Sequence, residues 1–177
     1  MKTKIYTKRG DQGKGFLIGT KKIWKDDLQV EAIGQIDEFN SLIGFSLSKI
    51  KDVKIKKQLD QVQSDLMLIS SIIAQNKVEV NKLNQSIMQL ENYIDQMELK
   101  LSELQNFILP GGGEIGSLLH VVRSVCRRTE RRLVSLNKKE KLPEEILIYI
   151  NRLSDYLFIL ARFVNFQQHK EEIIWKS

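Results

Sequence analysis

VNKLNQSIMQLENYIDQMELKL, residues 80–101, carries a regular apolar repeat. Its apolar positions alternate three and four residues apart, and they are Val80, Leu83, Ile87, Leu90, Ile94, Met97 and Leu101. Because an α-helix completes a turn in about 3.6 residues, this spacing gathers all of them on one face. The pattern predicts a helix that packs lengthwise against its neighbours at a shallow angle.

Four other segments have apolar residues at helical spacing, and they cover about 30–50, 59–73, 115–136 and 143–165. LPGGG at 109–113 and KKEKLPEE at 138–145 interrupt the pattern. Pro143 suits the first turn of a helix, and the two glutamates after it favour the positive end of the helix dipole. We therefore predict a single all-α domain, a bundle of about five helices over residues 30–166 with a tail over 167–177.

The first 29 residues do not show helical spacing. They contain four glycines, at positions 10, 13, 15 and 19. Each glycine costs a helix about 1 kcal/mol relative to alanine. We expect a short strand or an extended entry, followed by a glycine-rich loop, which together form an N-terminal arm on the bundle.

Composition narrows the class of protein. A chain of 177 residues with 42% hydrophobic residues suits one domain with one core. The single Cys126 excludes an internal disulfide and fits a reducing cytoplasm, and with only two histidines the chain is poorly equipped for a Cys/His zinc site. No apolar run approaches the ~18 residues of a membrane span, and residues 1–6 lack the apolar core of a signal peptide. We therefore expect a cytoplasmic protein with no membrane partner.

The segment SVCRRTERRL, residues 124–133, places four arginines and one glutamate within an apolar helical pattern. Arg123, Arg127 and Arg131 fall on one stripe of the helix, because they are spaced four residues apart. A solvated basic face is one interpretation, given the net charge of +6. A site for a polyanion such as a triphosphate is the other, since guanidinium groups match phosphate oxygens. RNA is a third possible ligand, although no aromatic residue lies within this cluster to stack on bases.

Three further segments could contribute to a site. YTKRGDQGKGFLIG at 6–19 could hold phosphates with its backbone N–H groups, or could be a flexible basic arm, and it is not a Walker loop. Asp37 lies on or beside the apolar stripe of its helix, where a buried carboxylate needs a cationic partner; a flanking, exposed position is the alternative. YINRLSDYLFILAR at 149–162 carries polar residues in an apolar helix, which a polar network between helices would also explain.

Five segments in this order resemble one family: KIYTKRGDQG, WKDDLQVEAIGQIDEFNSLIGF, FILPGGG, LLHVVRSVCRRTERRL and YINRLSDYLFILARF. They are similar to the ATP:cob(I)alamin adenosyltransferases of the propanediol-utilisation type, which include the methylmalonic-aciduria type B enzymes. The resemblance implies a five-helix bundle that assembles as a homotrimer with active sites at the subunit interfaces. It also implies transfer of the 5′-deoxyadenosyl group of ATP to cob(I)alamin, which forms adenosylcobalamin and triphosphate.

The resemblance implies roles for particular residues. The arm would lie over ATP through Thr7, Lys8, Arg9, Gly10, Gly15, Phe16 and Lys25. Arg127 would contact the triphosphate with three residues close by, Arg128, Glu130 and Arg131. Asn151 would contact the nucleotide. Arg123 would pair with Asp37 across the interface, and Phe107 and Phe158 would form an apolar floor beneath the corrin.

Two positions depart from the family pattern, since Arg9 and Gly15 stand where the family usually has hydroxyl residues. Gly15 offers only its backbone N–H, while Arg9 adds a charge. We therefore expect nucleotide affinity and metal dependence to differ from those of family members with hydroxyl residues at these positions. The expected ligands are ATP, Mg²⁺ and cobalamin, with no metal bound by protein side chains alone. The expected partners are a second copy of the chain, a flavoprotein reductase and an adenosylcobalamin-dependent enzyme, and no nucleic acid.

Two alternatives stay open. One is a non-enzymatic basic helical module that binds RNA or an acidic protein. The other is a family member that holds or delivers adenosylcobalamin without making it efficiently.

Overall fold

The computed structural model describes residues 4–17, 22–74 and 80–176, so predictions for other positions, such as Gly19 in the arm, lie outside the described residues. The described residues form five helices: α1 (Leu28–Lys49), α2 (Val53–Ile73), α3 (Asn81–Glu98), α4 (Glu114–Lys139) and α5 (Glu144–Gln167). The predicted five-helix bundle is therefore confirmed. None of these helices is long and apolar enough to cross a membrane.

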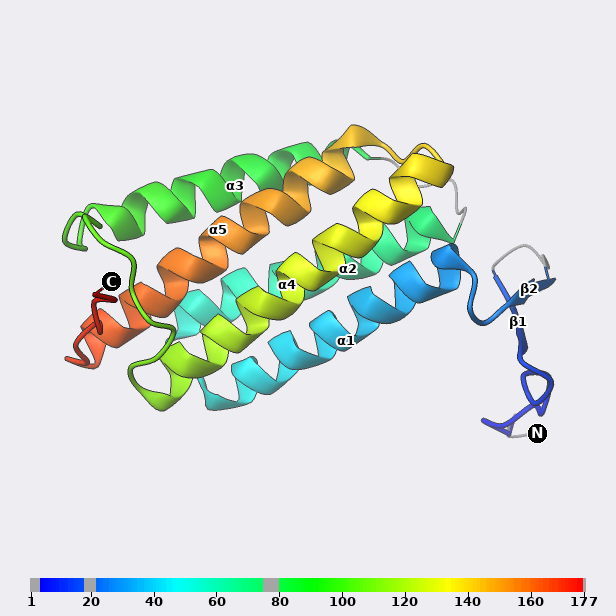
Figure 1. Cartoon of the computed structure of the whole chain (residues 1–177), viewed down its shortest axis with the longest axis horizontal. Helices are drawn as coiled ribbons and strands as arrows, with labels where there is room; N and C mark the ends of the chain where they lie inside the picture. Colours follow the sequence, from blue (N-terminus) through cyan, green and yellow to red (C-terminus); the bar gives the residue numbers. More distant parts are fainter. Residues whose placement is uncertain (1–3, 18–21, 75–79, 177) are drawn as a thin grey trace.

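The helices run side by side along the long axis of the molecule (Figure 1). Helix α5 packs against both α3 and α4, while α1 packs against α2 and α4. Helix α3 lies lengthwise against α5, as its apolar repeat predicts, with Leu83, Ile87 and Leu90 buried. The apolar stripes of all five helices therefore meet in one core.

Side-chain caps fix the starts of two helices. The Asp27 carboxylate accepts a hydrogen bond from the Gln29 backbone N–H at 2.9 Å, and Asp52 accepts one from the Lys54 N–H at 2.8 Å. Helix α5 begins at Glu144, so Pro143 precedes the helix in an extended conformation instead of forming its first turn. The two glutamates that follow do occupy the first turn, where the helix dipole favours them.

The N-terminal arm contains a β-hairpin that the sequence did not predict. Strand β1 (Lys14–Phe16) pairs antiparallel with β2 (Lys22–Trp24), and Gly15 lies opposite Ile23. The chain enters without a strand over residues 4–7 and then turns over residues 8–13, so a glycine-containing loop follows the entry as expected, and only the alternative of a strand at the entry is wrong. The strand that does form contains Gly15 and comes after this loop. Three-residue strands are too short for an alternating apolar pattern, which is why the prediction failed here.

The chain after α5 folds back onto the segment between α3 and α4. Gln168 follows the last residue of α5, and the backbone then pairs with residues 107–109. The Leu109 N–H donates to the Ile173 carbonyl and the Trp175 N–H donates to the Phe107 carbonyl, each at 2.8 Å. The predicted tail is thus attached to the bundle through main-chain hydrogen bonds.

Among the described residues, the core contains one buried carboxylate, that of Asp65 on α2, which is only 4% exposed. It accepts hydrogen bonds from the Gln61 amide at 2.9 Å and from the Tyr149 hydroxyl at 3.0 Å. Burial nevertheless raises the pKa of Asp65 above its ordinary value of 3.8, although Gln61, Ser86 and Tyr149 act in the opposite direction. The folded chain therefore holds this proton more tightly than the unfolded chain does.

This raised pKa predicts a pH dependence of stability. The destabilising contribution of Asp65 is absent below its unfolded pKa of 3.8, and it grows as the pH rises towards the higher folded pKa. The variant Asp65→Asn does not titrate. Its free energy of unfolding should therefore improve relative to wild type as the pH rises from about 4, as measured by urea denaturation over a pH series. Asp60→Asn, an exposed position on the same helix, is the control; a difference between Asp65→Asn and wild type that stays constant with pH would contradict this assignment.

Candidate active site

Helix α4 carries the predicted row of arginines. Arg127 and Arg131 are exposed, and Arg123 is half-buried. The Arg127 guanidinium lies 3.7 Å from the Glu130 carboxylate, a loose pair that leaves half of the arginine side chain accessible. No ion pair to Arg131 occurs within the described residues. The stripe thus presents cationic groups that the chain itself only partly neutralises.

The adjacent stripe of α4, formed by Arg128 and Arg132, is bound to helix α1. Arg128 donates to Glu38 at 2.6 Å and to the side-chain oxygen of Gln35 at 3.0 Å. Arg132 pairs with Glu31 at 2.6 Å. Asp37 was a predicted partner for the arginines, but it is exposed in the single chain, and its neighbours on α1 make the pairs. The exposed alternative for Asp37 is the one observed, because its position falls just off the buried stripe of α1.

Arg123 has an unusual environment for a cation. Its guanidinium carbon lies 5.8 Å from the centre of the Phe158 ring, close enough for a cation–π contact. Its Nε is buried without a hydrogen-bond partner among the described residues. Burial, followed by the charge of Arg127, lowers the pKa of Arg123 below its usual range. An anion here would relieve both the unpaired donor and the repulsion between the two arginines.

A cleft of about 670 Å³ brings four predicted residues together. Arg123 and Arg127 come from α4, Phe158 comes from α5, and Phe107 comes from the segment between α3 and α4. Phe107 is 79% exposed, which is costly for an aromatic ring unless something covers it. The cleft therefore has cationic groups and apolar rings side by side.

Helix α5 supplies polar groups to the same region. The Asn151 amide donates to Glu130 at 3.0 Å, so two predicted residues are in contact. Arg152 donates to Glu91 on α3 at 2.9 Å and to Asp155 at 3.1 Å. Arg152 and Asp155 also line the cleft, although sequence analysis did not select them as site residues. In the sequence they stood out only as polar residues within an apolar helix. The polar network between helices that would also explain them does exist, since Arg152 on α5 reaches Glu91 on α3.

The arm residues lie elsewhere. Thr7, Lys8 and Arg9 are exposed, Lys8 has a left-handed backbone with φ of 57°, and the Lys25 ammonium lies beside Gly10. Figure 1 shows the arm at one end of the bundle, beside the start of α1, while the segment between α3 and α4 lies at the other end. One chain alone does not bring the arm to the segment that carries Phe107, and no described arm residue lines the cleft.

Comparison with known proteins shows the family to which the chain belongs. Residues 5–164 match the protein family described as "Cobalamin adenosyltransferase". The chain belongs to this family. It is accordingly an enzyme of the corrinoid adenosyltransferase class.

Relatives in the cobalamin adenosyltransferase family span most of the chain. "Corrinoid adenosyltransferase" of Bacillus subtilis (strain 168) is 39% identical and covers 92% of this chain and 86% of its own length. "Corrinoid adenosyltransferase MMAB" of Homo sapiens is 37% identical, with 97% of this chain and 73% of the human protein covered. A variant of the PduO-type ATP:corrinoid adenosyltransferase from Lactobacillus reuteri, complexed with cobalamin and ATP, has a TM-score of 0.94 at 34% identity. That comparison covers 98% of this chain and 97% of the Lactobacillus reuteri chain.

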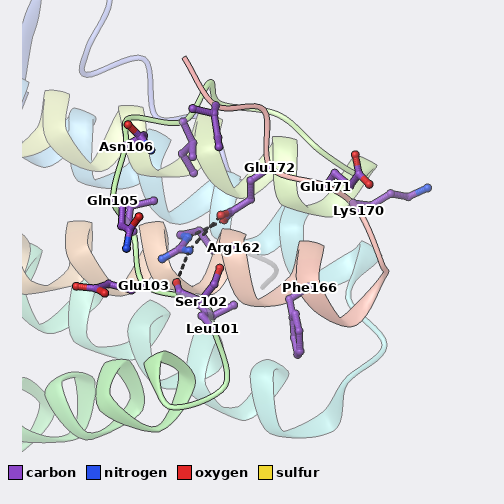
Figure 2. Close-up of a pocket in the computed structure, with 13 residues that line it drawn as sticks. Leu101, Ser102, Glu103, Gln105, Asn106, Arg162, Phe166, Lys170, Glu171 and Glu172 are labelled. Atoms are coloured by element: carbon purple, nitrogen blue, oxygen red, sulfur yellow. Dashed lines mark hydrogen bonds and ion pairs between the residues drawn. The ribbon is translucent and has the colours of Figure 1, made fainter. Parts of the chain in front are cut away.

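A buried arginine of this adenosyltransferase holds the segment that carries Phe107. Arg162 on α5 is 4% exposed and donates to the Glu172 carboxylate at 2.6 and 3.1 Å and to the Ser102 carbonyl at 3.0 Å. Figure 2 shows its guanidinium pointing towards both partners. The Trp175 ring packs edge-on against Phe107, with ring centres 6.4 Å apart. Arg162 was not predicted as a site residue, and its one sequence signal is a charged residue within the apolar run FILARFVNF.

The Arg162 contact predicts a specific loss of stability. Glu172→Gln keeps the shape of the side chain but removes the charge opposite a buried guanidinium. The free energy of unfolding should fall by about 2 kcal/mol, the usual contribution of a charge-assisted hydrogen bond, as measured by urea denaturation. The neighbouring, exposed Glu171→Gln is the matched control and should change little; equal effects of the two variants would rule out the buried pair as the cause.

Proposed function

We propose that this protein transfers the 5′-deoxyadenosyl group of ATP to the cobalt of cob(I)alamin and releases triphosphate. The observation that carries the proposal is the cleft in which Arg123 and Arg127 face Phe107 and Phe158. Cationic groups suit a triphosphate, and the exposed ring of Phe107 beside the half-buried ring of Phe158 suits the flat face of a corrin. Family membership and the relatives complexed with cobalamin and ATP support the same pairing.

The arginines act on the leaving group. Attack at C5′ of ATP expels triphosphate, whose growing negative charge needs fixed cations that are already in place. Arg127 offers a half-exposed guanidinium, and the unpaired Nε of Arg123 lies along the same stripe. In the proposed complex Lys8 and Lys25 of the arm add further positive charge.

Mg²⁺ enters the proposal as the ion that accompanies the triphosphate. Within the described residues, no group of three or more His, Cys, Asp or Glu side chains gathers to hold a metal. The phosphate oxygens are therefore the expected ligands of the ion, with the protein holding the nucleotide.

The chemistry needs no protein nucleophile, since cob(I)alamin itself attacks. The one cysteine, Cys126, is buried, and burial raises its pKa, so its thiol is unreactive. The protein contributes position and electrostatics instead. Phe107 and Phe158 would exclude water and the lower axial ligand from cobalt, which makes the ion easier to reduce to Co(I).

Assembly would complete the site. The arm and the segment between α3 and α4, which carries Phe107, lie at opposite ends of one chain, so an arm from a second copy is the natural cover for the nucleotide. Asp37 is exposed on α1, and the unpaired Arg123 Nε needs an acceptor. A homotrimer in which these two residues pair between copies would satisfy both groups.

The alternatives receive less support. A basic module for RNA would present the arginine cluster freely, whereas Arg128 and Arg132 are already paired with Glu38 and Glu31. A Cβ added at Gly15 would meet no atom within 4 Å, so the hairpin has room there for a larger side chain. The flavoprotein reductase and the adenosylcobalamin-dependent enzyme stay predictions from the family resemblance.

The transferase activity is tested first with the Arg127→Ala variant. Chemically reduced cob(I)alamin, Mg²⁺ and ATP are mixed without oxygen, and absorbance follows the formation of adenosylcobalamin. We expect ATP-dependent turnover by wild type, with kcat/KM lowered about 10²–10³-fold in Arg127→Ala because a charge-stabilising donor is lost. Lys138→Ala, which removes an exposed cation from the last turn of the same helix, should retain activity.

Each other outcome of this assay has a distinct meaning. Tight corrinoid binding without turnover would identify a carrier. Absence of both turnover and corrinoid binding would reject the proposal and return the arginine cluster to a solvated or RNA-binding face.

Phe107→Ala separates the apolar wall from the nucleotide site. Loss of the ring should impair reduction of bound cob(II)alamin about tenfold or more while the affinity for ATP stays within about twofold. Phe166→Ala, an exposed phenylalanine outside this cleft, is the control. Reduction is followed by absorbance with a chemical reductant, and ATP binding is measured by calorimetry. Equal losses of reduction and of ATP affinity would contradict the role assigned to Phe107.

A further inference from the structure

The glycine run that follows Phe107 is held by one side chain from α5. Asn165 is 2% exposed, and its amide Nδ2 donates to the Gly111 carbonyl at 2.9 Å. Its Oδ1 accepts from the Gly113 N–H at 3.0 Å. The amide thus uses its donor on one side of Gly112 and its acceptor on the other, so one side chain binds the backbone on both sides of the turn.

The glycines are shaped around this amide. A Cβ added at Gly112 or at Gly116 would overlap the Asn165 side chain, and one at Gly113 would meet the Gln168 side-chain oxygen at 2.6 Å. Gly112 also has φ of 106°, a conformation that other residues rarely adopt. Because these glycines have no side chains, they leave a cradle that the Asn165 side chain fills. This explains why glycine occurs both before the first residue of α4, at Gly112, and after it, at Gly116.

The cradle joins the two walls of the cleft. Phe107 lies four residues before Gly111, and Arg123 lies two turns after Gly116 on α4. Arg162 holds the start of this segment through Ser102, and the tail pairs with its middle. Asn165 is the contact that fixes its end, where the chain turns into α4.

We propose that Asn165 is a positioning residue for the corrinoid-facing wall, a role that rests on the proposed adenosyl transfer. Its amide sets the path of residues 109–113 and thereby the place of Phe107 opposite the arginines. Without it, the Gly111 carbonyl and Gly113 N–H lose their partners and a turn of three glycines gains many other conformations. The arginine row is held independently, because α4 packs against both α1 and α5.

The first experiment is steady-state kinetics on full-length Asn165→Ala. The kcat/KM for cob(I)alamin should fall about tenfold, the effect of one or two lost hydrogen bonds, while KM for ATP stays within about twofold. Gln167→Ala, an exposed residue two positions on, is the control and should leave both unchanged. Equal changes in the two substrates, or no change in either, would overturn the proposal.

A second experiment tests the cradle itself and does not require activity. In the wild-type background, Gly116→Ala should lower Tm and speed amide hydrogen exchange in residues 102–113, because its Cβ displaces the Asn165 amide. In the Asn165→Ala background the same change should raise Tm, since the space is free and alanine favours a helix over glycine. Additive effects in the double variant would show that the two residues do not share one site and would overturn the proposal.

The two experiments distinguish the failure of this inference from failure of the proposed function. Wild-type protein that makes no adenosylcobalamin would sink the proposed function, and the corrinoid role of Asn165 with it. Wild-type activity together with unaltered corrinoid kinetics in Asn165→Ala would sink this inference alone.

Discussion

The complete burial of residues 159–165 of α5 is the constraint on which the rest of the structure depends. Every residue from Ile159 to Asn165 is buried, so all faces of the helix are covered. Helices α3 and α4 cover two of these faces, and the segment before α4 together with the tail lies over the C-terminal end. A helix apolar on all sides is stable in water only when it is enclosed in this way.

Two polar side chains in this buried region then determine where the loops lie. An unpaired guanidinium or amide in a core is costly, so Arg162 and Asn165 must find partners. Arg162 finds Glu172 and a backbone carbonyl, while Asn165 finds the glycine turn. The requirement to satisfy buried polar groups in α5 therefore places the segment that carries Phe107.

The charges on α4 are divided by their orientation towards neighbouring helices. The arginines that face α1 are neutralised by its glutamates, and they fasten the two helices together. The arginines that face the cleft have at most one loose partner among the described residues. The same short sequence thus performs a structural task on one stripe and leaves cations available for an anion on the other.

The five helices, their order and their approximate bounds follow from the sequence, because a period of three to four residues is a local property that any one segment reveals. The residue types of the site were also visible, since the arginines, the two phenylalanines and the glycine run stand out from their surroundings. The hairpin of the arm was not visible in the sequence, because three-residue strands carry no readable alternation.

The pairing of side chains was decided only by tertiary structure. Whether Arg128 or Arg127 faces the cleft, whether Glu38 or Asp37 meets an arginine, and whether Asn165 reaches a glycine 52 residues away depend on how helices rotate and pack. Those contacts form between segments far apart in the chain, where the sequence pattern fixes a face to within one or two residues but not the partner. The sequence alone therefore determined the scaffold and the chemical groups, while packing determined which of these groups are bound within the fold and which remain free for substrate.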